Sequence, residues 1–326
     1  TPAQITTDGT LGSRANLPGP DYQIGADLGR QHGGNLFHSF QDFNLNSLES
    51  ATFSGPNNVS NVISRVTGGN PSNIDGLIRS TMPNADMYFL NPYGIMFGPN
   101  AQLDVQGSFH ASTADYLRLG ENGRFDARNP SDSILTVAPV EAFGFLSDSP
   151  SVLSMEDSQL SLFPTTTFSL VGGDLTLKNT QLAIPSGRVN LASVAQAGEI
   201  NVSTFTTDFE KQGTINIFDN SILDVSGLGA GAIWIHGGKL LLHDSLLQAN
   251  TQGDLDGHGI HLRLNESVDI YRPLIINSEM FSIANRNFGS GAAGGITITT
   301  PHFSLTHSGI NSNSFGAGHA GDIFVR

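Results

Sequence analysis

The chain has 326 residues, of which 15 are basic and 29 acidic, so its formal net charge is −14. This charge argues against binding to nucleic acid or to an anionic membrane surface, because each phosphate contact needs a cation. The absence of cysteine excludes disulfides, thiolate metal sites and a thiol nucleophile. With only 13% charged residues and 38 glycines, the composition favours short strands and tight turns over long helices. No apolar run approaches the roughly 20 residues of a membrane span, so we expect no membrane insertion.

The first residues, TPAQITTDGT, contain neither an initiator Met nor the basic and apolar regions of a signal peptide. We therefore expect a mature or excised piece from which a signal peptide has been removed. Five large apolar side chains follow within residues 33–45, and their mass is suited to cover one end of a repetitive β-structure: Leu36, Phe37, Phe40, Phe43 and Leu45. Segments 61–69 and 72–80 each fit a strand or a single helical turn. Segment 112–120 fits a short helix or a capping segment.

The stretch from Ala85 to Phe109 contains two sets of turn-forming residues between apolar strand-like runs. Pro92 restricts φ and Gly94 accepts a positive φ, so residues 91–94 predict a turn that redirects the chain. Asn91 is expected to hydrogen-bond its own corner, and asparagines of adjacent coils can stack into a ladder. These residues are interpreted as architectural first, with direct contact to a partner as the second interpretation.

From about residue 170 a phrase recurs in which glycine, any residue, and an apolar-x-apolar strand follow one another. Alternation with period two marks a strand with one buried face, and the glycine marks a bend before it. The first apolar position recurs after 27, 36 and 27 residues, at Ile233, Ile260, Ile296 and Ile323. Earlier copies of the phrase begin at Gly173, Gly187, Gly198 and Gly213, and the copy with Ile233 begins at Gly231. The gaps between these copies are too short for a full coil, so some of the strands are expected on other faces of a coil.

A second phrase places an apolar residue two positions after a serine, at Ser221, Ser245, Ser278 and Ser308. Periods of 20–50 residues are typical of solenoids and propellers, and the hairpin signals of propeller blades are missing. The pattern predicts an all-β, right-handed parallel β-helix with an N-terminal capping segment and small extra-helical strands. Residues 1–145 are expected to form the capped first part. Residues 146–326 are expected to continue the coils of the same solenoid, which stops in the middle of a strand phrase.

Five motifs in register resemble the secretion domain of two-partner-secretion exoproteins, the filamentous-haemagglutinin-like family. They are DGTLGS, GGNLFHSFQDFNL, ISRVTGG, NPYGIMFGPNAQLDVQGSF and ASTADYLRL, and they fall between Asp8 and Leu119. The family's Asn-Pro-Asn-Gly corner corresponds to Asn91, Pro92, Tyr93 and Gly94, with Tyr in place of the second Asn. The family's Asn-Pro-Asn-Leu signature is matched only loosely, by residues 55–58 and 98–101. The N-terminal motif contributes Asn35, Phe37, Phe40 and Phe43.

The resemblance implies a function without chemistry and without a cofactor. Such a domain is recognised by a cognate outer-membrane β-barrel transporter with POTRA domains and folds as a β-helix outside the cell. The chain would then be a monomer that belongs to a large, adhesin-like surface protein. It would be exported through the periplasm of a Gram-negative-type envelope and be secreted or displayed at the cell surface. Direct transporter recognition would fall on the corner at Asn91–Gly94.

Two other functions remain open from the residues alone. A β-helical polysaccharide-degrading enzyme is one, because Asp254 and Asp256 precede a Gly-His-Gly segment and carboxylate pairs hydrolyse glycosidic bonds. The acids and His258 lie on one short loop, so a tight turn is the favoured interpretation, and a weak Ca²⁺ contact there is a lesser one. A carbohydrate-binding adhesin module is the other, with Trp234 as an outward aromatic residue, although packing on a neighbour is favoured.

Histidine spacing and serine motifs add no catalytic site. Strand geometry places His258 and His261 on opposite sides, so a zinc site is not expected. No Gly-x-Ser-x-Gly elbow is present, so a serine hydrolase is unsupported. The favoured interpretation is therefore a non-enzymatic secretion domain.

Overall fold

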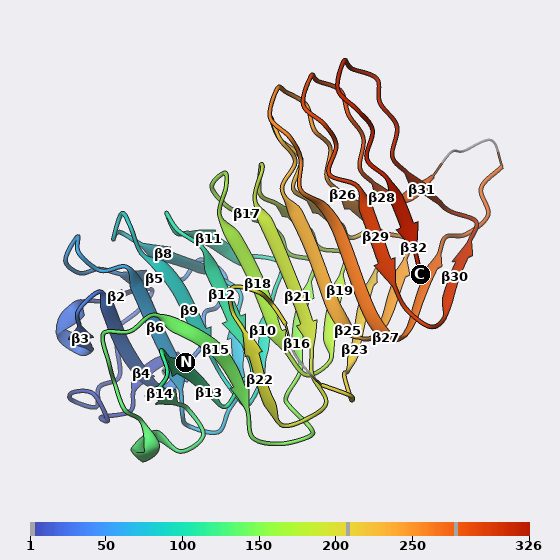
Figure 1. The fold of residues 1–326 in the computed structure, drawn as a ribbon. Coiled ribbons are helices and arrows are strands. Elements are labelled where there is room, and N and C mark those ends of the chain that lie inside the picture. Colours follow the sequence, from blue (N-terminus) through green and yellow to red (C-terminus); the bar gives the residue numbers. More distant parts are fainter. Residues whose placement is uncertain (1–3, 207–208, 277–279) are drawn as a thin grey trace. The chain divides into compact units, whose positions relative to one another are not determined.

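The computed structural model describes residues 4–206, 209–276 and 280–326, and within them the chain is all-β (Figure 1). Apart from strands, these residues form two single-turn 3₁₀ helices, η1 (Ala26–Leu28) and η2 (Pro130–Asp132). The chain divides into two compact units that are described separately. The first comprises Thr1–Ser154, Ser169–Gly173 and Val194–Glu210; the second comprises Met155–Phe168, Asp174–Ser193 and Lys211–Arg326. Strands β16 (Leu153–Glu156) and β18 (Thr167–Gly172) have residues in both units.

The first unit is built on parallel ladders whose strands recur about once per coil. One ladder contains β4 (Asn35–Phe43), β6 (Asn61–Val66), β9 (Asp86–Leu90) and β12 (Phe109–Ser112). A second contains β2 (Asp21–Ile24), β5 (Ser50–Phe53), β8 (Leu77–Ser80) and β11 (Gln102–Asp104). A shorter parallel pair joins β7 (Ser72–Ile74) to β10 (Ile95–Phe97).

Antiparallel strands complete the first unit. The first strand of the long ladder, β4, pairs antiparallel with β1 (Ile5–Thr7) and β3 (Arg30–His32), so its outer edge is covered. A separate antiparallel sheet has the order β14 (Gly123–Asp126), β13 (Tyr116–Leu119), β15 (Val140–Phe145) and β22 (Gly198–Asn201). These strands lie outside the parallel ladders.

The antiparallel sheet explains why both faces of the first ladder are apolar. Side chains of one register row, such as Leu36 and Phe109, are fully buried inside the coils. The opposite face carries the row Phe37, Ile63, Tyr88 and His110, which would otherwise meet solvent. Phe125 of β14 packs on Phe37 with ring centroids 4.9 Å apart, and Phe143 of β15 lies 6.4 Å from Tyr88. The aromatic mass predicted at residues 33–45 is therefore core.

The second unit contains three parallel ladders. One runs through β19 (Leu175–Lys178), β23 (Thr214–Phe218), β25 (Ala232–His243), β27 (Gly259–Tyr271) and β30 (Phe303–Thr306). Another runs through β21 (Arg188–Ser193), the first halves of β25 and β27, β29 (Ile296–Thr299) and β32 (Ile323–Val325). The third contains β17 (Gln159–Ser161), β20 (Gln181–Ala183), β24 (Ile222–Asp224), β26 (Leu246–Gln248), β28 (Phe281–Ala284) and β31 (Gly309–Asn311).

The predicted period sets the register of the second unit. Ile233 pairs with Ile260, Ile260 with Ile296, and Ile296 with Ile323 in unbroken parallel succession. The serine phrase marks a corner, because Ser221, Ser245 and Ser308 each directly precede a strand of the third ladder. The serine phrase at Ser278 does not fit this register, because Ile283 pairs with Leu247 in place of Met280. Ser278 itself lies outside the described residues.

Segments 61–69 and 72–80 form strands, one of the two alternatives that their sequences left open. Two other segments differ from what the sequence suggests. The helix considered over 112–120 is wrong, because Tyr116–Leu119 is the central strand β13 of the antiparallel sheet, flanked by β14 and β15. The phrase beginning at Gly198 forms β22, which pairs antiparallel with β15 and not with a coil. β22 has its partner β15 in a distant part of the sequence, and a local pattern carries no sign of such a partner.

Candidate functional site

Residues 91–94 form a hydrogen-bonded turn at the end of β9. The Gly94 amide donates to the Asn91 carbonyl at 3.2 Å, and the Tyr93 amide donates to Asn91 Oδ1 at 2.9 Å. Asn91 is fully buried, and its Nδ2 donates to the Asn70 carbonyl at 3.0 Å and to Ser72 Oγ at 2.9 Å. The side chain of Asn91 thus connects its own turn to the preceding coil through Asn70 and Ser72.

Gly94 has φ +126°, a conformation that side chains with a Cβ rarely adopt. A Cβ on this residue would approach Pro71 Cβ to 3.2 Å, and the Gly94 carbonyl accepts from the Ser72 amide at 3.0 Å. The turn is therefore held tightly against the coil before it. Pro92 is also buried.

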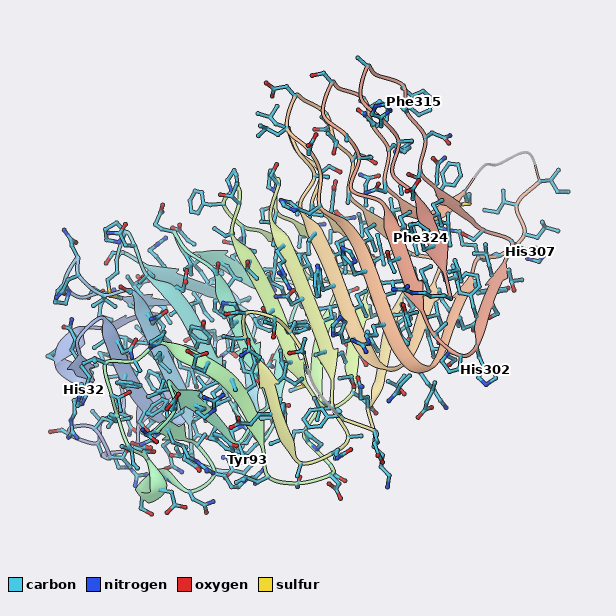
Figure 2. The ribbon with its side chains drawn as sticks, in the orientation of Figure 1. His32, Tyr93, His302, His307, Phe315 and Phe324 are labelled. Carbon is cyan, nitrogen blue, oxygen red and sulfur yellow. The ribbon has the colours of Figure 1, made fainter. Side chains whose placement is uncertain are left out.

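Tyr93 is the member of the corner whose side chain is partly exposed (Figure 2). The guanidinium of Arg128 lies 4.6 Å from the centroid of its ring. Arg128 in turn pairs with Asp115, Nε to Oδ1 at 3.0 Å, and Asp115 Oδ2 accepts from the Leu146 amide at 2.6 Å. The side chains at this corner that other molecules can reach are therefore an aromatic ring and the cation stacked on it.

The N-terminal motif residues do not join the corner into one accessible site. Asn35 is buried, and its Nδ2 donates to the carbonyls of Thr136 and Ala138 at 3.1 and 2.7 Å. Its Oδ1 accepts from Asn61 Nδ2 at 3.0 Å, so an asparagine pair between adjacent strands occurs here. Asn91 was expected to pair in the same way with an asparagine side chain of an adjacent coil. Its side chain donates instead to the Asn70 carbonyl and to Ser72 Oγ. Phe37, Phe40 and Phe43 are fully buried core residues.

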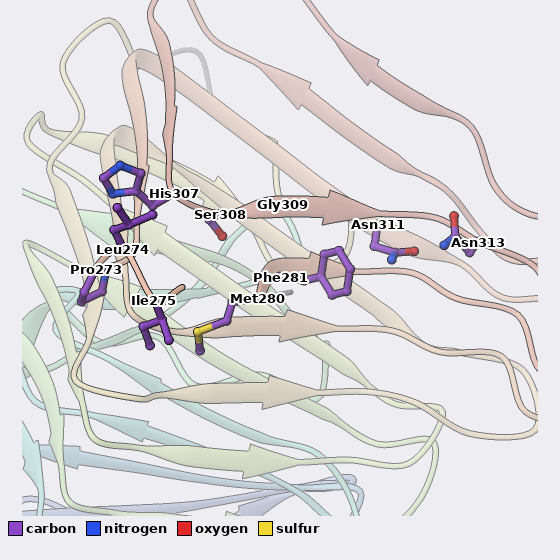
Figure 3. Close-up of a pocket in the computed structure, with 10 residues that line it drawn as sticks. All are labelled: Pro273, Leu274, Ile275, Met280, Phe281, His307, Ser308, Gly309, Asn311 and Asn313. Carbon is purple, nitrogen blue, oxygen red and sulfur yellow. The ribbon is translucent and has the colours of Figure 1, made fainter. Parts of the chain in front are cut away.

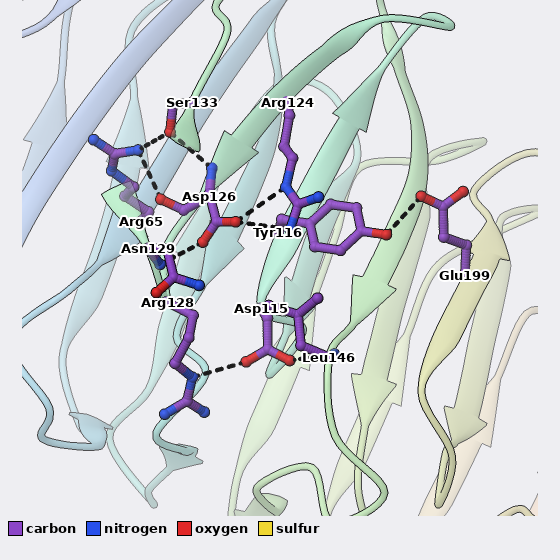
Figure 4. A network of polar contacts seen from close by, with 10 residues as sticks. All are labelled: Arg65, Asp115, Tyr116, Arg124, Asp126, Arg128, Asn129, Ser133, Leu146 and Glu199. Atoms are coloured by element: carbon purple, nitrogen blue, oxygen red, sulfur yellow. Dashed lines mark hydrogen bonds and ion pairs between the residues drawn. The ribbon is translucent and has the colours of Figure 1, made fainter. Parts of the chain in front are cut away.

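A buried arginine is the polar residue that sequence reasoning missed in this unit. Arg65 lies within the ISRVTGG motif, and its side chain is fully buried. It donates to Ser39 Oγ at 2.8 Å and to Thr10 Oγ1 at 3.0 Å. It also donates to the Asp126 carbonyl at 2.8 Å and to Ser133 Oγ at 2.7 Å (Figure 4). Burial lowers the pKa of Arg65 to about 10, and the nearby Asp8 and Asp126 carboxylates oppose this shift.

The Arg65 contacts connect three parts of the first unit. Thr10 and Ser39 lie near the start of the chain, whereas Asp126 ends the antiparallel strand β14 and Ser133 follows it. Asp126 also accepts from Arg124 at 2.9 Å and from the Asn129 amide at 2.6 Å (Figure 4). The arrangement is a cross-link between the ladder and the antiparallel sheet. A lone arginine in a strand pattern gives no signal of such burial.

The residues considered for catalysis do not converge. Asp254 and Asp256 are exposed on one loop, and Asp256 Oδ1 accepts from the Ala292 amide at 2.9 Å. The loops stacked on it, residues 287–294 and 314–321, contain no acidic residue, so no second carboxylate is brought in from the next coils. Among the described residues no group of three or more His, Asp or Glu side chains could hold a metal ion.

A hollow of about 630 Å³ lies between Leu274 and Ile275 on one side and His307 and Gly309 on the other (Figure 3). Its described lining contains no carboxylate.

In the part of the chain that the structure covers, no helix has the length and apolar character needed to cross a membrane.

Comparison with known proteins identifies the class. The family model described as the TPS secretion domain matches residues 3–256. The chain therefore belongs to the TPS secretion domain family. The role of this family is secretion and not catalysis. TPS domains work with a transporter partner, and the exoproteins that contain them are secreted or surface-exposed.

Individual relatives are more distant. The heme/hemopexin-binding protein of Haemophilus influenzae is 34% identical over 84 residues, which are 26% of this chain and 9% of that protein. The crystal structure of the HMW1 secretion domain from Haemophilus influenzae is 14% identical, with a TM-score of 0.49 over 97% of this chain and 98% of that one. The filamentous hemagglutinin secretion domain is 13% identical, with a TM-score of 0.44 over 99% and 97%. The chain spans only a small part, 9%, of the length of the heme/hemopexin-binding protein.

Proposed function

We propose that this chain is the secretion domain of a large, adhesin-like exoprotein and is recognised as a monomer by a cognate outer-membrane β-barrel transporter with POTRA domains. The family match over residues 3–256 carries the proposal. The buried, uncharged interior of the candidate corner supports it, because these residues build a turn and perform no chemistry. The proposed route leads through the periplasm to the cell surface.

Folding of the exported chain is proposed to produce a right-handed parallel β-helix. The stacked parallel ladders of each unit support this interpretation. Residues 1–145 would form the capped secretion core and residues 146–326 would continue as β-helical coils. Since each coil adds hydrogen bonds to the one before, folding outside the cell would draw the chain outward and oppose its return.

The corner is proposed to divide its roles between folding and recognition. Asn91, Pro92 and Gly94 are buried and would serve the turn, whereas Tyr93 offers the transporter a partly exposed aromatic ring. Aromatic side chains and arginine are enriched where proteins recognise one another, and Arg128 lies on the same ring. The N-terminal motif residues Asn35, Phe37, Phe40 and Phe43 would act only through the fold.

A secretion assay tests the proposal. The chain, preceded by a signal peptide, is produced in a Gram-negative host with and without a candidate POTRA-bearing barrel protein from the same genome, and the amount in the medium is measured. We expect export only with the barrel protein, and no export of Gly94→Val, in which the turn is blocked. Tyr93→Ser should reduce export while the purified variant keeps the circular dichroism spectrum and melting temperature of the parent chain.

Phe163→Ser is the matched control, because it removes an aromatic ring that is 44% exposed and lies outside the corner. This variant should be exported like the parent chain. Equal export with and without the barrel protein would refute the proposed function. Normal export of Tyr93→Ser would refute the recognition role of that ring alone.

A further inference from the structure

A half-buried arginine stacks on the chain's only tryptophan on the outer face of the second unit. The strand β25 buries Ile233 and Ile235 and turns Trp234 outward, as its alternation predicts. The Arg188 guanidinium lies 4.4 Å from the centroid of the indole ring, and the His261 ring lies 5.0 Å from it. Trp234 pairs with His261 on the next strand, so the two rings are neighbours by register.

These side chains line a hollow of about 310 Å³, close to the lower end of the size range of small-molecule sites. Its floor is Gly187 and Ala232, and its rim includes the hydroxyl-bearing residues Thr165 and Ser186. Thr165 and Ser186 have φ of 65° and 52°, a left-handed conformation that is uncommon without glycine. Small residues thus open the space, and the rim follows an unusual backbone path around it.

His258 and His261 line the same hollow, contrary to the expectation that they lie on opposite sides. His258 precedes β27, and Gly259, the first residue of that strand, has a φ of +96°, so the alternation of a regular strand does not extend to His258. Burial and the nearby Arg188 charge lower the pKa of His261, although a hydrogen bond to the His258 backbone opposes them. His261 is therefore neutral at pH 7, and with its N–H donated to the His258 backbone its other ring nitrogen can accept a hydrogen bond.

Arg188 supplies a cation that pairs with no carboxylate among the residues that the structure describes. Its Nε donates to Asn190 Oδ1 at 2.7 Å, whereas its Nη2 is buried without a hydrogen-bond partner. None of the described residues that line the hollow is acidic, although the chain as a whole has a net charge of −14. The part of Arg188 that lines the hollow therefore presents positive charge without an acidic neighbour in the lining, and an anion is the ligand that balances this charge.

We propose that this hollow binds a sugar ring that carries an acidic group, either a carboxylate or a sulfate. The combination favours this ligand class, because an aromatic face packs against sugar C–H groups, hydroxyls and imidazole bond to sugar hydroxyls, and a guanidinium binds the anion. The site is independent of the secretion role proposed for the corner at residues 91–94.

Because Trp234 is the only tryptophan, its fluorescence reports on the site directly. The purified chain is titrated with D-galacturonate, D-galactose 6-sulfate, neutral D-galactose and acetate. We expect a saturable change in emission with at least one acidic sugar, at roughly tenfold lower concentration than with galactose or acetate, since a charge-assisted hydrogen bond is worth about that factor. The two acidic sugars distinguish carboxylate from sulfate recognition.

Two variants test the residues. Arg188→Gln should weaken binding of the acidic sugar roughly tenfold and leave any galactose response unchanged. Ala232→Leu should abolish binding by filling the floor of the hollow without changing its charge, which keeps the test valid if Arg188→Gln unfolds. Lys239→Gln is the matched control, because it removes an exposed cation from β25, the strand that carries Ala232 and Trp234. Binding should not change in this variant.

Absence of a saturable response to both acidic sugars would overturn the proposal. Equal affinity for acetate and for the acidic sugars would also overturn it, because the sugar ring would then contribute nothing. The same holds for unchanged binding by folded Arg188→Gln and Ala232→Leu variants.

Discussion

At Gly94 the chain needs a backbone conformation that only glycine adopts at low cost, and Pro71 leaves little space beside it. We expect Gly94→Ala to lower the free energy of unfolding by about 1–3 kcal/mol. Gly69→Ala is the matched control, because Gly69 also has a positive φ of +94°, but a Cβ there would meet no heavy atom within 4 Å. Denaturant unfolding should therefore show a smaller loss for Gly69→Ala, and equal losses would contradict the role of the Pro71 contact.

Arg65 is the second residue whose effect can be isolated. Replacement by methionine keeps most of its volume but removes the donors to Ser39, Ser133 and the Asp126 carbonyl. We expect Arg65→Met to lower the free energy of unfolding by about 3 kcal/mol, because acceptors and the Asp8 carboxylate lose their buried partner.

The control for Arg65 is an exposed ion pair in the same unit. Arg79 pairs with Asp104 at 3.2 Å, but both side chains are more than 40% exposed. Arg79→Met should therefore change the free energy of unfolding by less than about 1 kcal/mol. If urea titrations gave Arg65→Met and Arg79→Met the same midpoint, the cross-linking role of Arg65 would be wrong.

At the scale of single elements, the third ladder of the second unit depends on hydroxyl groups at its corner. Ser221 and Ser245 are buried, the Thr180 amide donates to Ser221 Oγ at 2.9 Å, and the Ser221 amide donates to Ser245 Oγ at 3.1 Å. Each hydroxyl thus accepts a backbone donor of the coil before it. At Ser221 and Ser245 the serine phrase recurs with the same backbone donor to satisfy, whereas Ser308 Oγ contacts Ser282 Oγ at 2.6 Å.

Ser221→Ala would leave the buried Thr180 amide without its acceptor. We expect a loss of about 1–3 kcal/mol in the free energy of unfolding, measured by thermal or denaturant titration. Ser161→Ala, on the exposed face of β17 in the same ladder, should change the stability by less than about 0.5 kcal/mol. A loss at Ser161 as large as that at Ser221 would contradict the corner explanation.

The strands were predictable because period-two alternation is a local signal. Their period was predictable because the same motif recurs along the sequence at spacings of 27 and 36 residues. The sequence also places Asn91 to Gly94 in a turn, as the structure does. The full antiparallel sheet was not predictable, because β15 and β22 join it from more distant parts of the chain, although β13 and β14 form a local hairpin. The same reason hid the roles of Arg65 and Arg188, whose neighbours come from distant segments of the chain.

At the scale of whole units, the two differ in how they treat the outer face of their strands. In the first unit an antiparallel sheet covers the row Phe37, Ile63, Tyr88 and His110. In the second unit the corresponding outward positions of β25 and β27 carry Trp234 and His261, which line an open hollow. A covered face adds buried apolar area to the unit, whereas an open face keeps side chains available to a ligand.

Two histidines of the first unit are also buried, His110 in the covered outer row and His38 among the inward side chains of β4. Burial lowers the pKa of His38 and of His110 to about 4, although the Asp27 carboxylate partly opposes the shift at His38. His38 has neither ring nitrogen hydrogen-bonded, and His110 pairs through Nδ1 with Ser169 Oγ at 2.8 Å. Both rings are therefore neutral in the folded chain at pH values where the unfolded chain, with an ordinary His pKa of about 6.5, takes up protons.

The direction of the pH dependence follows from these two shifts. The unfolded state binds more protons than the folded state between pH 6.5 and about 4, so the stability of the first unit is full above pH 6.5 and falls as the pH drops through this window. Each histidine contributes up to about 3 kcal/mol to that loss. Asp86 acts in the opposite sense, because burial raises its pKa above the ordinary value of 3.8, and a hydrogen bond from the Ser108 amide limits that rise.

The measurement is the midpoint of urea unfolding at pH 7.0, 6.0, 5.0 and 4.5 for the parent chain and for His38→Phe. Phenylalanine suits the site because the His38 ring already lies 5.5 Å from Phe53 and 6.0 Å from Phe40. It cannot take up a proton, so the variant should lose less stability on acidification than the parent chain does. Midpoints of the parent chain that stay constant from pH 7 to 4.5 would mean that protonation of these buried rings costs nothing, and the first unit would have to open around them without unfolding.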